Sequence, residues 1–260
     1  MAFFLEKWYA DCVTPAGDVL IAYAASLQWL GVRIRYMGAI DDQGRASGTF
    51  RWGSKLELDP QGANWDLAVG HRTGTYDLSW KTTQPVSSVA PLLVQGTELV
   101  AWQPLAVFAQ VVEKHSDRPV GTGYIERLCL TIKPWDLGLH ILRWGRWIGS
   151  QHTLTWVEWE GRHPRRVAIL NGHCCSLVNI GPTRVFLENG CHLAFGTPKV
   201  LVHARLGEDA LRIFSYLPGL IPRPFLDGVE CKYLAPATLT CGNSQDEGWA
   251  IYEEVIWPAQ

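Results

Sequence analysis

The chain has 260 residues, enough for one large domain or two small ones and for a core that needs no disulfide or metal ion to hold it together. Hydrophobic residues make up 47% of the sequence and charged residues 18%, which excludes an intrinsically disordered protein. The net charge of −2 does not favour nucleic acid or an anionic membrane surface as a general partner. The 13 Trp, 8 Tyr and 8 Phe residues offer flat surfaces for an apolar ligand, or an unusually bulky core.

The cysteines and the N-terminus predict a reduced, cytoplasmic protein. Seven cysteines are an odd number, and they form no C-x-x-C pair, unlike the patterned set of an oxidised scaffold. The stretch Met1–Trp8 lacks the basic region of a signal peptide and reaches Glu6 almost at once. The longest apolar stretch, Val19–Val32, is interrupted by polar residues and is too short for a spanning helix.

Strands and turns dominate the pattern in chain order. Val32–Met37 alternates between apolar and polar residues, and so does Thr153–Trp159, as expected of half-buried strands. Turn sequences separate such runs along the chain, at Asp41–Gly44, Asp59–Gly62, Asn171-Gly172 and Asn189-Gly190. Only Pro104–His115 and Glu208–Phe214 could hold short helices. The spacing predicts an all-β sandwich or barrel.

A short repeat points to two similar halves. Gly121–Glu126 and Gly248–Glu254 each contain a glycine followed by Tyr-x-Glu, and Tyr124 and Tyr252 lie 128 residues apart. A tandem of two barrels, each ending in an equivalent closing strand, would explain the repeat, although so short a match can also arise by chance. Proline interrupts the strand pattern near Lys133-Pro134, so we expect domains at 1–132 and 133–260.

Glu126 is the first candidate for chemistry. Alternation places it on the apolar face of its strand together with Tyr124, so we expect it to point into the barrel interior. Removal from water penalises the ionised carboxylate, and a neutral carboxylic acid there can act as a general acid. The alternative is a structural ion pair with an internal arginine.

The next strand supplies candidate partners. In His140–Trp147 one face carries Trp144 and Arg146 and the other carries Arg143 and Trp147, so alternation does not decide which arginine points inward. His152 follows in the connection to the next strand, either as a catalytic group or as a histidine satisfied by its structure. Trp156 and Glu158 then share one strand face.

No metal or cofactor is expected. His173–Cys175 and Cys191-His192 contain soft ligands, yet their spacing matches no zinc pattern. Nucleotide-binding glycine loops and the G-x-S-x-G nucleophile motif do not occur. The segment His71–Trp80 alternates polar and aromatic residues and is either a solvated strand or one wall of a pocket that includes Trp80.

Three motifs carry a resemblance to a known family. Lys7–Cys12, Gly121–Glu126 and the Leu-Arg-Trp-Gly-Arg run at Leu142–Arg146 resemble the carotenoid 1,2-hydratase (hydroxyneurosporene synthase) group. That group belongs with two-barrel, lipocalin-like (calycin) proteins that include fungal Diels–Alderases and, more distantly, tocopherol cyclase. The resemblance implies two tandem antiparallel β-barrels, a hydrophobic pocket, no cofactor, and a small isoprenoid or polyene substrate that the protein would collect by peripheral membrane contact.

The resemblance also implies roles for the candidate residues. Glu126 would protonate a C=C bond, Tyr124 would orient the acid or the water, and Arg143 or Arg146 would tune the acid, with His152 nearby. A neighbouring Arg⁺ stabilises the carboxylate, so at most one arginine can contact Glu126 in this mechanism. The rings of Trp144, Trp156 and Trp159 would stabilise a carbocation. The full substrate-binding wall comprises Trp80, Trp144, Trp156, Glu158, Trp159, Tyr252 and Glu254.

Two other functions compete with a hydratase or cyclase. The barrels could carry a hydrophobic molecule as lipocalins do, with Glu126 and Arg143 in a structural pair. They could also promote a cycloaddition by shape alone, in which case the acidic residues would be dispensable. The sequence indicates no oligomeric state.

Overall fold

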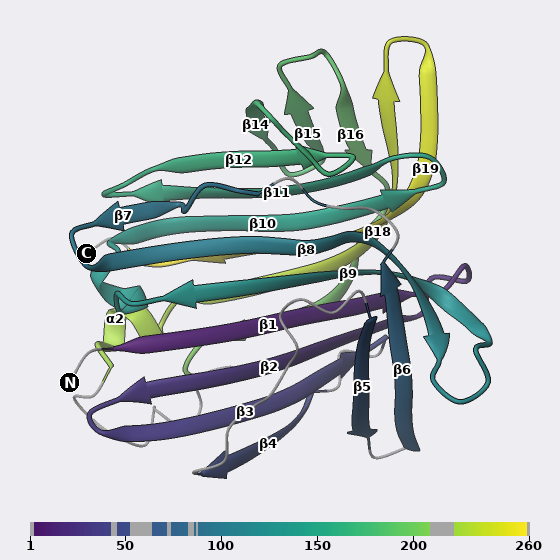
Figure 1. The fold of residues 1–260 in the computed structure, drawn as a ribbon. Coiled ribbons are helices and arrows are strands. Elements are labelled where there is room, and N and C mark those ends of the chain that lie inside the picture. The colour runs from purple at the N-terminus through teal and green to yellow at the C-terminus, as the bar shows by residue number, and fades with distance from the viewer. Residues whose placement is uncertain are drawn as a thin grey trace. The chain divides into compact units, whose positions relative to one another are not determined.

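The computed structural model describes residues 3–42, 46–52, 64–71, 74–82, 86, 88–208 and 221–258. The chain divides into two units, Met1–Lys133 and Pro134–Gln260, each built on one antiparallel sheet (Figure 1). One sheet closes nearly into a barrel and the other forms a half-barrel, which confirms the predicted all-β, tandem-barrel fold. Within the described part of the chain, no helix has the length and hydrophobicity needed to cross a membrane.

The first unit is a sheet in the order β4-β3-β2-β1-β9-β8-β6-β5, with β7 paired to β8. Its strands are β1 (Phe4–Val13), β2 (Val19–Trp29), β3 (Val32–Asp41), β4 (Ala46–Trp52), β5 (Asn64–His71), β6 (Gly74–Thr82), β7 (Leu93–Gln95), β8 (Glu98–Glu113) and β9 (Pro119–Leu130). The last strand, β9, pairs with the first, β1, and so brings the two ends of the unit together.

The second unit repeats this arrangement, in the order β13-β12-β11-β10-β19-β18-β16-β15-β14, with β17 paired to β18. Its strands are β10 (Leu139–Gly149), β11 (Thr153–Gly161), β12 (Arg165–Leu170), β13 (His173–Cys175), β14 (Leu177–Ile180), β15 (Arg184–Leu187), β16 (His192–Phe195), β17 (Lys199–Arg205), β18 (Val229–Cys241) and β19 (Ser244–Ile256). A 3₁₀ turn (Pro134–Asp136) opens it, and the last strand, β19, again pairs with the first, β10.

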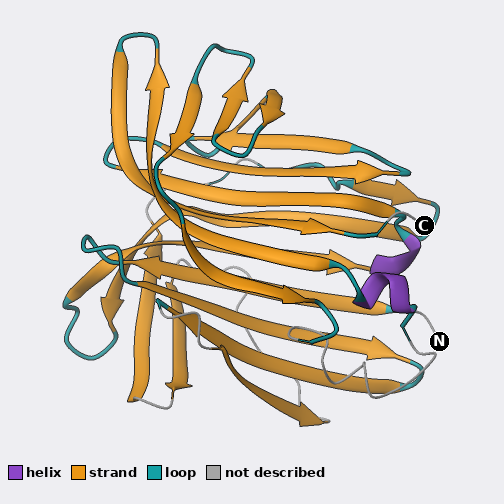
Figure 2. Ribbon diagram, turned by 180° about the vertical axis from the view of Figure 1, so that it is seen from behind, coloured by secondary structure: helices purple, strands orange, loops and turns teal. Residues whose placement is uncertain are grey.

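The predicted helix at Pro104–His115 is wrong, because most of these residues belong to the long strand β8. Alternate residues of β8 are buried from Val100 to Ala106, and the β-branched residues that follow favour an extended chain. The other expected helix lies outside the described residues beyond Glu208. A short helix, α2 (Arg223–Leu226), forms instead near the C-terminal end of the chain, as Figure 2 shows.

Two of the predicted turns are confirmed. Asn171 and Gly172 both have positive φ, 51° and 78°, and join β12 to β13, as the tight hairpin turn of an Asn-Gly pair requires. Asn189-Gly190 joins β15 to β16, with Gly190 at φ 83°. The turn at Asp59–Gly62 lies outside the described residues.

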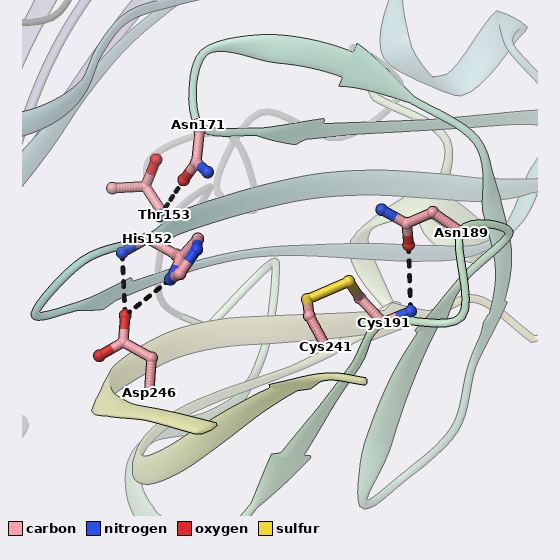
Figure 3. Close-up of a disulfide and its surroundings, with 7 residues drawn as sticks. All are labelled: His152, Thr153, Asn171, Asn189, Cys191, Cys241 and Asp246. Carbon is pink, nitrogen blue, oxygen red and sulfur yellow. Dashed lines mark hydrogen bonds and ion pairs between the residues drawn. A yellow bond between two sulfur atoms is a disulfide. The ribbon is translucent and has the colours of Figure 1, made fainter. Parts of the chain in front are cut away.

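The prediction that the cysteines are reduced is wrong for one pair. Cys191 and Cys241 form a disulfide that links the start of β16 to the end of β18 (Figure 3). The two strands pair from His192 and Thr240 onward, so the sheet register itself brings the sulfurs together. An odd total conceals such a pair, because the other five cysteines form no disulfide.

Each unit has a core cluster on the inner side of its curved sheet. In the first unit the cluster contains residues of β1, β2, β3, β6, β8 and β9, including Trp8, Trp80 and Ile125. Strands that are not neighbours in a curved sheet can touch only on its concave side. Trp80 in β6 makes such a contact, because its indole Nε1 donates to the Asp11 carbonyl in β1 at 2.6 Å. In the second unit Trp147 and Trp156 belong to the corresponding cluster.

The closing strands β9 and β19 match with a shift of 127 residues. Gly121 in β9 and Gly248 in β19 lie so close to the first strand of their unit that a Cβ atom would meet the Val13 or Ile148 carbonyl oxygen at 2.2 or 2.0 Å. Strand register agrees, since Val13 opposes Thr122 and Ile148 opposes Trp249. This shift makes Glu253 in β19 the counterpart of Glu126 in β9. The Tyr-x-Glu match, which aligns Tyr124 with Tyr252, instead makes Glu254 the counterpart of Glu126.

Candidate functional site

Glu126 lies in β9 and is buried, with 9% of its surface exposed. Its Oε2 atom accepts hydrogen bonds from the indole Nε1 of Trp102 at 2.5 Å and from the hydroxyl of Tyr124 at 2.9 Å. Tyr124 is fully buried and Trp102 nearly so. The carboxyl group is thus surrounded by large aromatic rings that carry polar tips, as a buried polar group requires.

The expected burial of Glu126 is confirmed, but the expected strand face is wrong. Ile125 belongs to the core cluster on the concave side, so Glu126 and Tyr124 lie on the opposite face of β9. Alternation failed because residues on both faces of this strand are buried, from Tyr124 through Glu126. A strand covered on both sides gives no contrast between apolar and polar positions.

A second tyrosine–acid pair lies beside the first. In β1 the hydroxyl of Tyr9 donates to Oδ2 of Asp11 at 2.8 Å, and Asp11 is fully buried. Tyr9 sits directly opposite Glu126 in the antiparallel register, and its ring lies 6.1 Å from that of Tyr124. We call Tyr9, Asp11, Tyr124 and Glu126 the tyrosine–acid face.

The sequence analysis missed Tyr9, Asp11 and Trp102. Tyr9-Ala10-Asp11 has the same Tyr-x-acid spacing as Tyr124-Ile125-Glu126, so a search for that short pattern would have found the first two. No local sequence pattern identifies Trp102, because its contact with Glu126 depends on the pairing of β8 with β9.

Arg143 is the centre of a separate polar cluster on the concave side of the second unit. Its guanidinium donates to Glu254 at 2.7 Å, Glu158 at 3.0 Å and Glu160 at 3.1 Å. Burial alone would lower the pKa of Arg143, but the hydrogen bonds to Glu158 and Glu254 outweigh it and raise that pKa. Arg166 binds the other oxygen of Glu158 at 2.5 Å. These five residues form the arginine network.

Aromatic rings line the same concave face, next to the arginine network. The ring of Tyr252 stacks on Phe195 at 4.3 Å and on Tyr233 at 5.1 Å, and Trp156 lies 6.0 Å from Phe195. Gly145 makes room for this arrangement, because a Cβ atom there would meet the Trp156 ring at 2.2 Å. Of the predicted binding residues, Trp156, Glu158, Tyr252 and Glu254 therefore share one face with Arg143.

The other predicted residues lie elsewhere. Trp144, Arg146 and Trp159 are buried on the face of the second unit opposite Arg143, where Arg146 donates to the Trp249 carbonyl at 2.9 Å. Trp80 belongs to the core cluster of the first unit. Alternation left open which of the two arginines points inward. The structure places Arg143 on the concave side of the sheet and Arg146 on the opposite face.

His152 lies in the loop between β10 and β11, at the far end of β10 from Arg143 (Figure 3). Its backbone N–H and its Nδ1 atom both contact Oδ2 of Asp246, at 2.9 and 3.2 Å. Asp246 also accepts hydrogen bonds from the backbone and hydroxyl of Ser150 and from the backbone of Gln151. These contacts give His152 a structural role in holding the loop.

Across the described ranges, no group of three or more His, Cys, Asp or Glu side chains has an arrangement that could hold a metal ion. The soft ligands at His173–Cys175 lie in β13, where Cys174 is exposed. Burial, as the largest cause, raises the pKa of the Cys175 thiol and so favours its protonated form.

Comparison with known proteins gives a class of fold. No family model matches the sequence, and no curated protein matches it. Among solved structures, CghA with Sch210972 aligns with a TM-score of 0.60 at 8% identity, over 98% of this chain and 88% of that one. Kievitone hydratase from Nectria haematococca aligns with a TM-score of 0.55 at 8% identity, over 98% and 89% of the two chains.

The Nitrosomonas europaea protein NE1406 aligns with a TM-score of 0.54 at 12% identity, over 98% of this chain and 92% of that one. All three alignments extend over nearly the whole chain, so both units take part. At these identities the likeness establishes the fold, that of two-barrel, lipocalin-like proteins.

Proposed function

We propose that the protein is a cofactor-independent hydratase or cyclase that protonates a C=C bond of a small apolar isoprenoid or polyene, with Glu126 as the acid. The observation that carries the proposal is a carboxyl group buried among aromatic side chains, on the tyrosine–acid face. The likeness to kievitone hydratase, by its name an enzyme that adds or removes water, supports this class of reaction. The structure of CghA, which holds the small molecule Sch210972, supports a small-molecule ligand for this fold.

The proton donor in this mechanism is the neutral carboxylic acid of Glu126. A proton on Oε1 leaves the hydrogen bonds of Trp102 and Tyr124 to Oε2 in place. As the proton moves to an alkene carbon, negative charge develops on the carboxylate, and these two bonds strengthen. Stabilisation that grows along the reaction lowers the barrier, whereas equal stabilisation of both states would not.

The cation formed by protonation has two fates. In a cyclisation a second double bond attacks it, and the new cation on the ring loses a proton to Asp11 and forms a C=C bond. In a hydration a water molecule attacks it. Electron-rich rings of Tyr9 and Tyr124 stabilise the cation in either case. Asp11, oriented by the Tyr9 hydroxyl, is the proposed base that takes the proton from the attacking water. Return of that proton to Glu126 closes the cycle.

The test is turnover of a panel of acyclic isoprenoids and polyenes in D₂O, followed by mass spectrometry. Hydration adds the mass of one heavy water, and protonation-driven cyclisation leaves a solvent deuteron on carbon. A cycloaddition by shape alone incorporates no deuterium. Product with carbon-bound deuterium is the expected result, and product without it contradicts acid catalysis.

Glu126→Gln is the decisive variant, because it keeps the shape of the side chain but removes the acid. We expect its turnover to fall by at least about a hundredfold, the usual contribution of a general acid. Glu98→Gln makes the same substitution at an exposed position of β8 and should leave turnover unchanged. Wild-type rates in Glu126→Gln with a native near-UV circular dichroism spectrum would overturn the proposal.

A further inference from the structure

A row of polar side chains crosses the concave side of the second unit. In the strand register, each member lies directly opposite the next, across six strands from β12 to β17. The row consists of Arg166, Glu158, Arg143, Glu254, Cys231 and His203. Its first four members form ion pairs of alternating sign, which the arginine network already explains. The row ends in a thiol and an imidazole, which the proposed hydratase or cyclase does not use.

Cys231 and His203 are in contact. The Sγ atom of Cys231 lies 3.5 Å from Nδ1 of His203, within hydrogen-bonding distance for sulfur. Cys231 is half-buried and His203 is exposed, so the pair can be reached from solvent. A thiol whose proton can pass to an adjacent base is the arrangement of an activated sulfur nucleophile.

Tyr233, two residues along β18 on the same face, completes the surroundings of the thiol. Burial, joined by a hydrogen bond with Cys231 and by the negative charge of Glu254, raises the pKa of Tyr233 to about 12. The phenol therefore keeps its proton at neutral pH and can act as a donor beside the sulfur.

An aromatic platform begins next to the thiol. Tyr233 stacks on Tyr252, and Tyr252 stacks on Phe195 with an angle of 12° between the ring planes. Tyr252 is half-buried, and burial raises its pKa, so its ring stays neutral. The ring of Tyr252 thus stacks on two neighbours, and Tyr233 forms the end of the stack beside the thiol. A flat, conjugated molecule that packs against this end of the stack would hold a reactive carbon near Sγ.

We propose that Cys231, with His203 as its base, is a covalent acceptor site for flat α,β-unsaturated carbonyl compounds bound against Tyr233 and Tyr252. The thiol proton moves to Nδ1 of His203, and the sulfur electron pair forms a C–S bond to the β-carbon. The C=C π electrons move toward the carbonyl oxygen to give an enolate. Return of the proton from His203 to the α-carbon completes the addition, which needs no oxidant or reductant.

The experiment measures adduct formation by the full-length protein with 4-phenyl-3-buten-2-one, a flat aryl enone, without added reductant. Peptide mapping by mass spectrometry gives the rate at each cysteine. We expect Cys231 to react at least about tenfold faster than the exposed Cys174, as for a thiol with an adjacent base. His203→Asn should remove this excess at Cys231 and leave the rate at Cys174 unchanged.

A second variant separates binding from intrinsic reactivity. Tyr252→Leu should slow the aryl enone at Cys231 but not iodoacetamide, which is too small to use the platform. Equal rates at Cys231 and Cys174 in the wild-type protein, or no effect of His203→Asn, would overturn the proposal. Addition of the enone to Cys231 does not use Glu126, so Cys231 in the Glu126→Gln variant should form the adduct at the wild-type rate.

Discussion

Five acidic side chains of the described residues illustrate three kinds of contact that hold a carboxyl group. Asp246 accepts hydrogen bonds from the backbone of one loop. Glu158 and Glu254 form ion pairs with Arg143. Asp11 and Glu126 accept hydrogen bonds from tyrosine hydroxyls, which carry no charge. The proposed proton transfer uses acids of this third type.

Asp246 should make stability depend on pH in the acid range. Burial alone would raise its pKa, but hydrogen bonds from Ser150, Gln151 and His152 outweigh burial and lower it to about 2. A folded-state pKa below the unfolded value means that the stabilisation is present above about pH 4 and lost as the pH falls through 2. We expect Asp246→Asn to lower the free energy of unfolding at pH 7 by roughly 2 kcal/mol.

Urea denaturation of Asp246→Asn at pH 7 and pH 3 checks this expectation. The difference from the wild type should shrink as the pH falls to 3, because Asp246 is then largely protonated in the unfolded chain while it is still ionised in the folded protein. Glu247→Gln, at the exposed next position, is the matched control and should change stability little. A difference that is constant across this pH range would contradict the carboxylate as the source.

Residue-scale prediction from the sequence was partly successful. Glu126 and Tyr124 were selected from a strand pattern, and the structure places both in one buried contact. The pattern could not give their partner Trp102, because that contact depends on which strand pairs with β9. His152 and Arg146 were selected by residue type, and the structure gives each a local structural contact.

At the scale of elements, the closing strands depend on glycines that permit close approach. Gly248 lies where a Cβ atom would meet the Ile148 carbonyl oxygen at 2.0 Å, a contact that requires backbone movement. We expect Gly248→Ala to lower the free energy of unfolding by about 3 kcal/mol, the upper range for overpacking. Thermal unfolding followed by circular dichroism measures this loss.

Gly181→Ala is the matched control, because its new Cβ atom would have its nearest neighbour at 3.7 Å. That change should stay within about 0.5 kcal/mol of the wild type. Similar losses for the two variants would contradict the close approach of β19 and β10 as the cause.

Strands and turns were predictable where local chemistry determines them. The tight hairpin turn requires positive φ angles at two successive residues, which few pairs other than Asn-Gly adopt readily. The hairpin accordingly forms at Asn171-Gly172. The failure at β8 has a physical reason, since Pro104 is an acceptable first residue of a helix and the following apolar residues suit either structure. Pairing with β9 over most of its length selects the strand.

At the scale of the whole molecule, the Cys191–Cys241 disulfide cross-links residues 50 apart in the sequence. Closing a loop of that length restricts the unfolded chain, which corresponds to about 4 kcal/mol in the chain-entropy model. We therefore expect the Cys191→Ser/Cys241→Ser double variant to unfold at a clearly lower urea concentration. Reductant should shift the wild-type midpoint in the same direction.

Cys174→Ser, at an exposed free cysteine, provides the control and should keep both the midpoint and its response to reductant. A double variant with the wild-type midpoint would mean that the β16–β18 pairing alone secures this region.

The tandem organisation was predictable from a short repeat, but its register was not. The Tyr-x-Glu match aligns Glu126 with Glu254, whereas the glycine contacts and strand pairing align it with Glu253. A slip of one residue moves every side chain to the other face of a strand, so the repeat indicated the right strands and the wrong faces.

In the corrected register, Glu253 of β19 occupies the position that Glu126 occupies in β9. Glu253 accepts a hydrogen bond from the ammonium group of Lys232, whereas its counterpart Glu126 accepts hydrogen bonds from an indole and a phenol. The same position thus has a charged neighbour in one unit and neutral aromatic donors in the other, so exchanging these neighbours between the units would exchange the environments of the two acids.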